Sequence, residues 1–139
     1  METINENVER ILDLASDRVL RKLELEKVLE YFKKNEGQKE IIIKQISNYL
    51  SNLKTPDDET DLSYMLEDLD RASEHEYYSN IYISEKEERT IANLFCQRGI
   101  EMAQEGIEKF PDESDFENYL NSFKKKEKTL NSAIRYWFK

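Results

Sequence analysis

The stretch ANLFCQRGIEMAQEG, residues 92–106, carries small side chains at helical spacing. They follow one another at intervals of four, three, four and three positions, so they share one face of a helix. The stripe consists of Ala92, Cys96, Gly99, Ala103 and Gly106. Two glycines inside a helix cost roughly 1 kcal/mol each relative to alanine. Small residues allow a second helix to approach closely, so we expect the stripe to pack against a neighbouring helix. A groove for a binding partner is the alternative.

The sequence on both sides of this stripe shows the same helical periodicity, with apolar residues three and four positions apart. The expected helices cover about residues 4–35, as one helix or two, then 38–54, 61–72, 84–110, and 114 to near the C-terminus. The chain has only three Gly and two Pro, too few for the frequent turns of an all-β fold. We therefore expect an all-α fold of five to six helices, in an irregular bundle or as stacked helical hairpins.

Helix starts are indicated by capping residues. Ser84 and Glu87 form an S-x-x-E capping box before the long helix that contains the stripe. Thr60 or Asp61 is a suitable N-cap for the helix before it. The sequence A-S-D at residues 15–17 offers a cap for a second helix within the first apolar segment.

Length and composition restrict the class of protein. The 139 residues fit one domain, so we expect a single helical domain over residues 1–139. A lone cysteine excludes an internal disulfide or a cysteine-rich metal site. The N-terminus lacks a basic flank and an apolar run, and no window approaches the length of a membrane span. We expect a cytoplasmic protein that does not associate with membranes.

Charge is distributed unevenly along the chain. Acidic and basic residues balance in 1–56, whereas the formal charge is −8 over 57–76, −6 over 77–118 and +5 over 119–139. The middle of the chain is therefore an acidic body, and it is followed by a basic last helix.

The basic run KKKEK at 124–128 has a structural explanation. Cations in the C-terminal half of a helix complement the helix dipole. We expect Lys124, Lys125 and Lys128 to pair with acids elsewhere in the fold, and contact with nucleic acid or membrane is the alternative.

The most acidic segment is TPDDETDLSYMLEDLDRASEHEYY, residues 55–78. Like charges three and four positions apart weaken a helix, which favours a role for these acids beyond folding. Tyrosines lie among them, and tyrosine is common at binding hot spots. The predicted partner-binding residues are Asp57, Asp58, Glu59, Asp61, Tyr64, Glu67, Asp68, Asp70, Glu74, Tyr77 and Tyr78. A solvated face that only confers solubility is the other interpretation.

A calcium loop fits this segment poorly. Asp57, Glu59 and Asp61 match the first, third and fifth ligand positions, but Leu62 replaces the glycine of the sharp turn. At the twelfth position the shorter Asp68 replaces the bidentate glutamate. We expect no metal ion and no other cofactor.

Catalytic motifs are missing from the sequence. It contains no phosphate loop, no dinucleotide-binding glycine motif and no nucleophile elbow. Cys96 lies on the small-residue stripe and is expected to be buried and inert. The pair Arg71 and His75 resembles the Arg-x(4–6)-His motif of the all-helical HEPN ribonucleases, but only three residues separate the pair. That resemblance implies RNA cleavage; otherwise the sequence predicts a protein that is not an enzyme.

A second resemblance involves the segment GIEKFPDESDFENYL, residues 106–120. It resembles the junction of two tetratricopeptide repeats, with Pro111 as the repeat-ending proline and Leu120, Ala133 and Trp137 at apolar repeat positions. The resemblance implies stacked helical hairpins. A full upstream repeat would also require a helix break within residues 84–110.

These observations predict a non-catalytic inhibitor of the immunity-protein, antitoxin or phage anti-defence type. Its acidic, tyrosine-bearing surface would cover a basic surface of a protein partner, such as a toxin or a nucleic-acid-processing enzyme. Direct nucleic-acid binding is disfavoured because phosphates would be repelled. The alternative is a helical adaptor or self-associating module that binds a peptide or partner helix in an apolar groove.

Overall fold

The computed structural model describes residues 4–74 and 84–137, with side chains of the last helix described as far as Asn131. The helices are α1 (Glu6–Leu14), α2 (Lys22–Lys34), α3 (Lys39–Asn52), α4 (Glu59–Ala72), α5 (Glu85–Lys109) and α6 (Asp115–Trp137), with a short 3-10 helix, η1 (Glu36–Gln38). The part of the chain that the structure describes contains no strand. The prediction of an all-α fold is confirmed.

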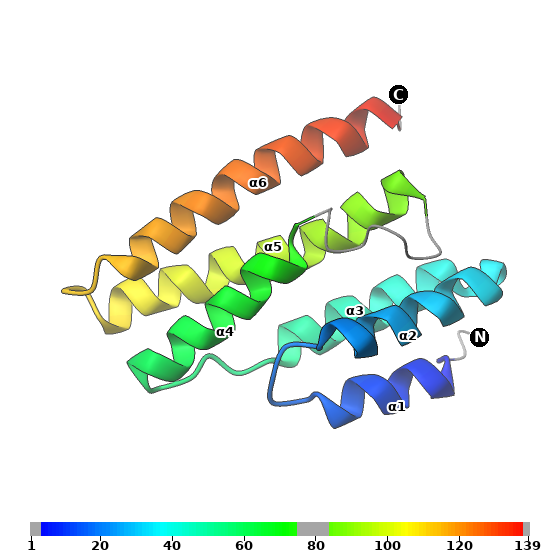
Figure 1. Ribbon diagram of the computed structural model, residues 1–139, viewed down its shortest axis with the longest axis horizontal. Helices are drawn as coiled ribbons and strands as arrows, with labels where there is room; N and C mark the ends of the chain where they lie inside the picture. Colours follow the sequence, from blue (N-terminus) through cyan, green and yellow to red (C-terminus); the bar gives the residue numbers. More distant parts are fainter. Residues whose placement is uncertain (1–3, 75–83, 138–139) are drawn as a thin grey trace.

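Successive helices run in opposite directions (Figure 1). The long helices α5 and α6 form a hairpin, α4 packs against both, and α3 connects α1 and α2 to α5. α5 is continuous over 25 residues, so the helix break that a further tetratricopeptide repeat requires is not present. One consequence decides where charges meet: the start of α4, the end of α5 and the start of α6 lie at the same end of the bundle.

The small-residue stripe of α5 packs closely against α6 and α4. A Cβ atom built on Gly99 would lie 2.5 Å from the ring of Phe123 in α6. At Gly106 it would lie 3.0 Å from both Leu62 of α4 and Phe116 of α6. The three other small residues of the stripe are fully buried. The expected packing against a neighbouring helix is confirmed, and the stripe is not an open groove.

The first apolar segment forms two helices, and the turn between them differs from the expected one. Residues 15–17 do not cap α2, which begins only at Lys22. Instead, Glu24 accepts a hydrogen bond from the backbone N–H of Arg21 at 2.9 Å. Its carboxylate also accepts two hydrogen bonds from Arg18, at 2.7 and 2.8 Å. The buried side chains of Val19 and Leu20 place the chain in the core before it turns, and this delays the helix start.

α4 begins earlier than expected. Its N-cap is Asp58, which has an extended backbone and accepts a hydrogen bond from the N–H of Asp61 at 3.0 Å. The prediction of Thr60 or Asp61 as the cap was wrong because Asp58 is an equally good capping residue and comes first. The capping box of Ser84 and Glu87 at the start of α5 is confirmed.

None of the described helices is both long enough and apolar enough to cross a lipid bilayer.

The contact between Gly99 and Phe123 can be tested by Gly99→Ala. Phe123 is fully buried, so its ring can move aside only by displacing other core side chains. We expect a loss of about 1–3 kcal/mol in unfolding free energy from overpacking, despite the better helix propensity of alanine. Urea denaturation measures the change. Gly37→Ala is the control, because nothing lies within 4 Å of its Cβ position. A Gly99→Ala variant as stable as the parent would contradict the packing argument.

The Arg18–Glu24 pair predicts a pH dependence of stability. The hydrogen bonds from Arg18 lower the pKa of Glu24 from 4.5 to about 2. A carboxyl group whose pKa is lowered on folding stabilises the fold fully at pH values above its pKa in the unfolded chain. This contribution of Glu24 is lost as the pH falls from about 4.5 towards 2. Glu24→Gln should lose about 1–2 kcal/mol at neutral pH.

Denaturation curves at several pH values should show the difference between Glu24→Gln and the parent shrinking across that acid range. Glu26→Gln, on the same helix, serves as the control and should follow the parent within about 0.5 kcal/mol. A constant difference at all pH values would exclude the ion pair as its cause.

Candidate functional site

The segment between α3 and α4 runs along α5 and brings the acidic stretch to one end of the bundle. Three contacts hold it: Arg98 donates to the carbonyl of Leu53 at 2.6 Å, Thr55 donates to Glu105, and Lys109 donates to Asp57 at 3.1 Å. Arg98 is itself buried. The start of α4 is therefore fixed beside the end of α5.

A second group of acids meets the first at this position. The turn from α5 to α6 carries its own carboxylates, and the two groups together form what we call the acidic end (Figure 1). The acidic end consists of Asp57, Asp58, Glu59 and Asp61 at the start of α4, and Asp112, Glu113 and Asp115 at the turn and the start of α6. The three residues of the turn were not predicted. The acidic run after Pro111 was the available signal, but its position beside α4 depends on the helix arrangement.

Glu59 and Glu113 lie close enough to interact directly. A hydrogen bond with the Glu113 carboxyl raises the pKa of Glu59, and the charges of Asp58 and Asp115 act in the same direction. The two carboxylates therefore repel each other when both are charged. An incoming cation would relieve the same repulsion.

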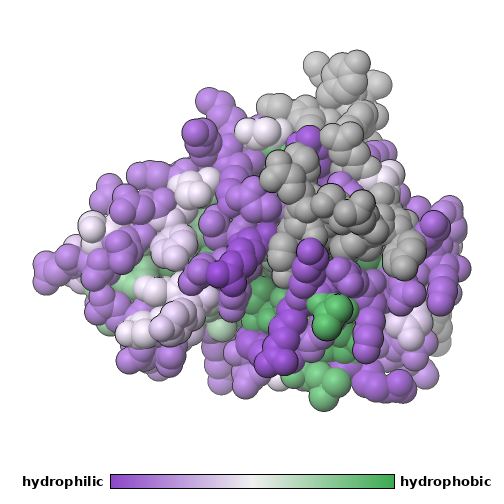
Figure 2. Space-filling view, viewed as in Figure 1, coloured by the Kyte–Doolittle hydropathy of each residue, from purple (hydrophilic) through white to green (hydrophobic). Residues whose placement is uncertain are grey.

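Little positive charge from the chain itself reaches the acidic end. Lys109 pairs with Asp57, whose side chain remains 99% exposed. No ion pair among the described residues reaches the other six carboxylates of the acidic end. Hydrophilic side chains cover much of the surface in this region, on the left of Figure 2. The acidic end is therefore an exposed concentration of negative charge.

The C-terminal half of α4 has a different environment, because its acids have an internal partner. Lys126 of α6 contacts Asp70 at 2.5 Å and Glu74 at 2.6 Å. Although burial opposes it, these hydrogen bonds raise the pKa of Lys126. The sequence led us to expect such pairs from the neighbouring lysines of the KKKEK run, but Lys126 forms this one. Two of the predicted partner-binding acids thus connect α4 to α6.

Two other predicted acids of α4 lie beside Arg71. Its guanidinium contacts Glu67 at 2.6 Å and Asp68 at 3.6 Å, both on the same helix. Tyr64 is 63% exposed, as a contact residue should be. The predicted residues Tyr77 and Tyr78 lie outside the described residues, as does His75, the partner of Arg71 in the ribonuclease resemblance.

A polar groove connects these two regions. It lies between α4 and α6, has a volume of about 390 Å³, and begins at Asp115 of the acidic end. Its walls include Ser63 and Asp70 from α4, and Asn118 and Ser122 from α6. All of these side chains offer oxygen acceptors, which suit the N–H groups of lysine and arginine.

The described side chains offer neither a metal-binding cluster nor a reactive thiol. Within residues 4–74 and 84–137, no group of three or more His, Cys, Asp or Glu side chains is arranged to hold a metal ion. Cys96 is buried, donates its Sγ hydrogen to the carbonyl of Phe123 at 3.0 Å, and has its pKa raised by burial to about 12. It is a packed thiol, as expected, and not a nucleophile.

Comparison of the chain with protein families, with characterised proteins and with solved structures finds no match.

The carboxyl pair can be tested by Glu113→Gln. Removing one of the two negative charges should bring the pKa of Glu59 down towards its ordinary value, because a neutral amide no longer repels the carboxylate. An NMR titration of the Glu59 side-chain carbonyl measures this. Glu117→Gln removes an exposed carboxylate elsewhere on α6 and should leave the Glu59 titration in place. An unchanged Glu59 pKa in Glu113→Gln would show that the two carboxyls do not interact.

Proposed function

We propose that this protein is a non-catalytic inhibitor of the immunity-protein, antitoxin or phage anti-defence type, which binds a basic surface of a partner protein through its acidic end. The observation that carries the proposal is the contact of Glu59 with Glu113, within a group of seven carboxylates of which one has a lysine partner. Such a group gains more from an external cation than from any side chain of its own fold.

The fold can hold this charge without a large loss of stability. The positive ends of the helix dipoles of α4 and α6 both lie at the acidic end, and each favours nearby carboxylates. Asp58 also satisfies a backbone N–H of α4. The two helix dipoles reduce the repulsion among the acids locally. The electrostatic field outside the acidic end remains negative. A negative field accelerates the approach of a basic partner and selects against acidic ones.

The contact surface extends from the acidic end along α4. Tyr64 supplies exposed aromatic area for a contact. Tyrosine loses little conformational entropy on binding because its side chain has few rotatable bonds. The groove between α4 and α6 supplies acceptors for the lysine or arginine side chains of the partner. The partner that fits is a nuclease or toxin with a positively charged active-site surface.

An adaptor that binds a helix or peptide in an apolar groove is the weaker candidate. The small-residue stripe, which together with the C-terminal aromatic residues was the sequence basis for that groove, is filled by Phe123 and Phe116 of α6. The acidic end, in contrast, is open to solvent.

The proposal is tested with a fourfold neutral variant in a pull-down from cells that express the protein. The variant carries Glu59→Gln, Asp61→Asn, Glu113→Gln and Asp115→Asn, and it leaves the Asp58 cap intact. We expect the parent to capture a basic protein at low salt and to lose it at high salt, because screening weakens exposed charge contacts. The fourfold variant should bind the purified partner at least about tenfold more weakly, or by about 1.4 kcal/mol.

A matched variant removes the same number of negative charges from α2, α3 and the turn before α2, with Asp17→Asn, Glu26→Gln, Glu30→Gln and Glu40→Gln. It should retain the partner. If both variants lose binding equally, the net charge matters and the acidic end does not. If the partner is still captured at high salt and by the fourfold variant, the binding surface lies elsewhere and the proposal fails.

A further inference from the structure

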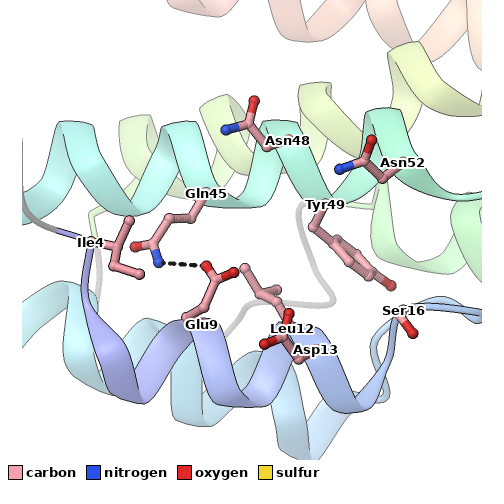
Figure 3. Close-up of a pocket in the computed structure, with 9 residues that line it drawn as sticks. All are labelled: Ile4, Glu9, Leu12, Asp13, Ser16, Gln45, Asn48, Tyr49 and Asn52. Carbon is pink, nitrogen blue, oxygen red and sulfur yellow. Dashed lines mark hydrogen bonds between the residues drawn. The ribbon is translucent and has the colours of Figure 1, made fainter.

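A cavity of about 320 Å³ lies between α1 and α3 (Figure 3). These helices lie on a different part of the molecule from the acidic end (Figure 1). Glu9 and Asp13 line it from α1, and Gln45 and Tyr49 reach towards it from α3. The described residues that line the cavity include two carboxylates and no lysine or arginine. Among the described residues, none with a positive charge lines this hollow, and Arg10 of α1 lines an adjoining hollow with the same two carboxylates.

The carboxylates are spaced to act together. Glu9 and Asp13 are four positions apart on α1, so they lie one above the other on the same helix face, with about 5–6 Å between their Cβ atoms. A planar guanidinium group, with donors along both edges, can reach two acceptors at this spacing. Neither carboxylate forms an ion pair within the described part of the chain, so their remaining acceptor positions are open to a ligand.

One wall of the cavity is held in place by a buried hydrogen-bond network. Gln45 is only 6% exposed, and its Nε2 donates to Oε2 of Glu9 and to the carbonyl of Asn5, both at 3.1 Å. Asn5 in turn caps α1 by accepting from the N–H groups of Asn7 and Val8 at 3.1 Å. The orientation of the Glu9 carboxylate is therefore fixed before any ligand arrives, which lowers the entropy lost on binding.

The remaining surface of the cavity suits the apolar part of an arginine side chain. Leu12 is 4% exposed and Tyr49 is 7% exposed, so each is a core residue with only a small part of its side chain at the cavity wall. The hydroxyl of Tyr49 donates to the carbonyl of Arg18, which holds the ring in position. Ile4 also lines the cavity and is 56% exposed, an unusual exposure for isoleucine. Methylene groups can pack on these side chains while the charged end reaches the carboxylates.

We propose that this cavity binds the guanidinium group of an arginine side chain presented by a partner protein. A metal ion fits less well, because the described residues hold no group of three metal-ligating side chains here or elsewhere. The inference uses none of the residues of the acidic end, so it stands or falls independently of the function proposed above.

The test is an NMR titration of the ¹⁵N-labelled protein with Nα-acetyl-arginine amide. The side-chain amide of Gln45 is the reporter, because it donates to Glu9 and will respond when the carboxylate gains another donor. Nα-acetyl-citrulline amide has nearly the same shape and no charge, so it should cause no saturable shift. Asp13→Asn should weaken binding of the arginine probe at least about fivefold, as expected for the loss of one charge-assisted hydrogen bond.

Glu40→Gln on α3 is the control, since it removes an exposed carboxylate that does not line the cavity. It should bind the arginine probe like the parent. Equal shifts with citrulline, or unchanged binding in Asp13→Asn, would overturn the proposal. Free L-arginine separates the two sources of a guanidinium group. Tighter binding of the free amino acid than of the capped probe would identify a small-molecule site and overturn the assignment to a partner protein.

Discussion

The contact of Gly99 with the ring of Phe123 is the constraint on which the rest of this structure depends. It allows α5 and α6 to approach closely over most of their length, and α4 then packs against the same stripe at Gly106. With α5 at the centre, the start of α4 and the turn before α6 must emerge at one end. The electrostatic arrangement of the molecule follows from this packing and not from the order of charges in the sequence.

The same helix also separates the acids of the chain into two classes. The contacts from α5 to the segment before α4 hold the first acids at the end of the bundle, where few cations reach them. Further along α4, the acids come within reach of Lys126 and become part of the α4–α6 contact. One continuous acidic sequence thus yields an exposed charge concentration and a set of internal ion pairs.

How far the sequence predicts this fold depends on the range of each interaction. Helix periodicity, the capping box at Ser84 and the packing role of the stripe can each be predicted from one short segment of sequence, without knowing which segment packs against it. All three are confirmed. The choice of Asp58 as the α4 cap was missed because several residues nearby cap equally well. Glu113 and Lys126 could not be identified, because their partners are more than fifty residues away and depend on how α4 lies against α6. The cavity between α1 and α3 was missed because Glu9 and Gln45 are 36 residues apart and meet only when α1 packs against α3.

Two negatively charged surfaces on one molecule need not duplicate each other. The carboxylates of the acidic end are exposed, and their field extends into solvent, where salt screens it. Such a surface affects mainly how fast a basic partner arrives. The carboxylates of the α1–α3 cavity are fixed by Gln45 and bordered by apolar side chains, so they favour one side chain of suitable shape. A partner that used both would gain its association rate from the first surface and its residence time from the second, and single substitutions at the two sites should separate these effects.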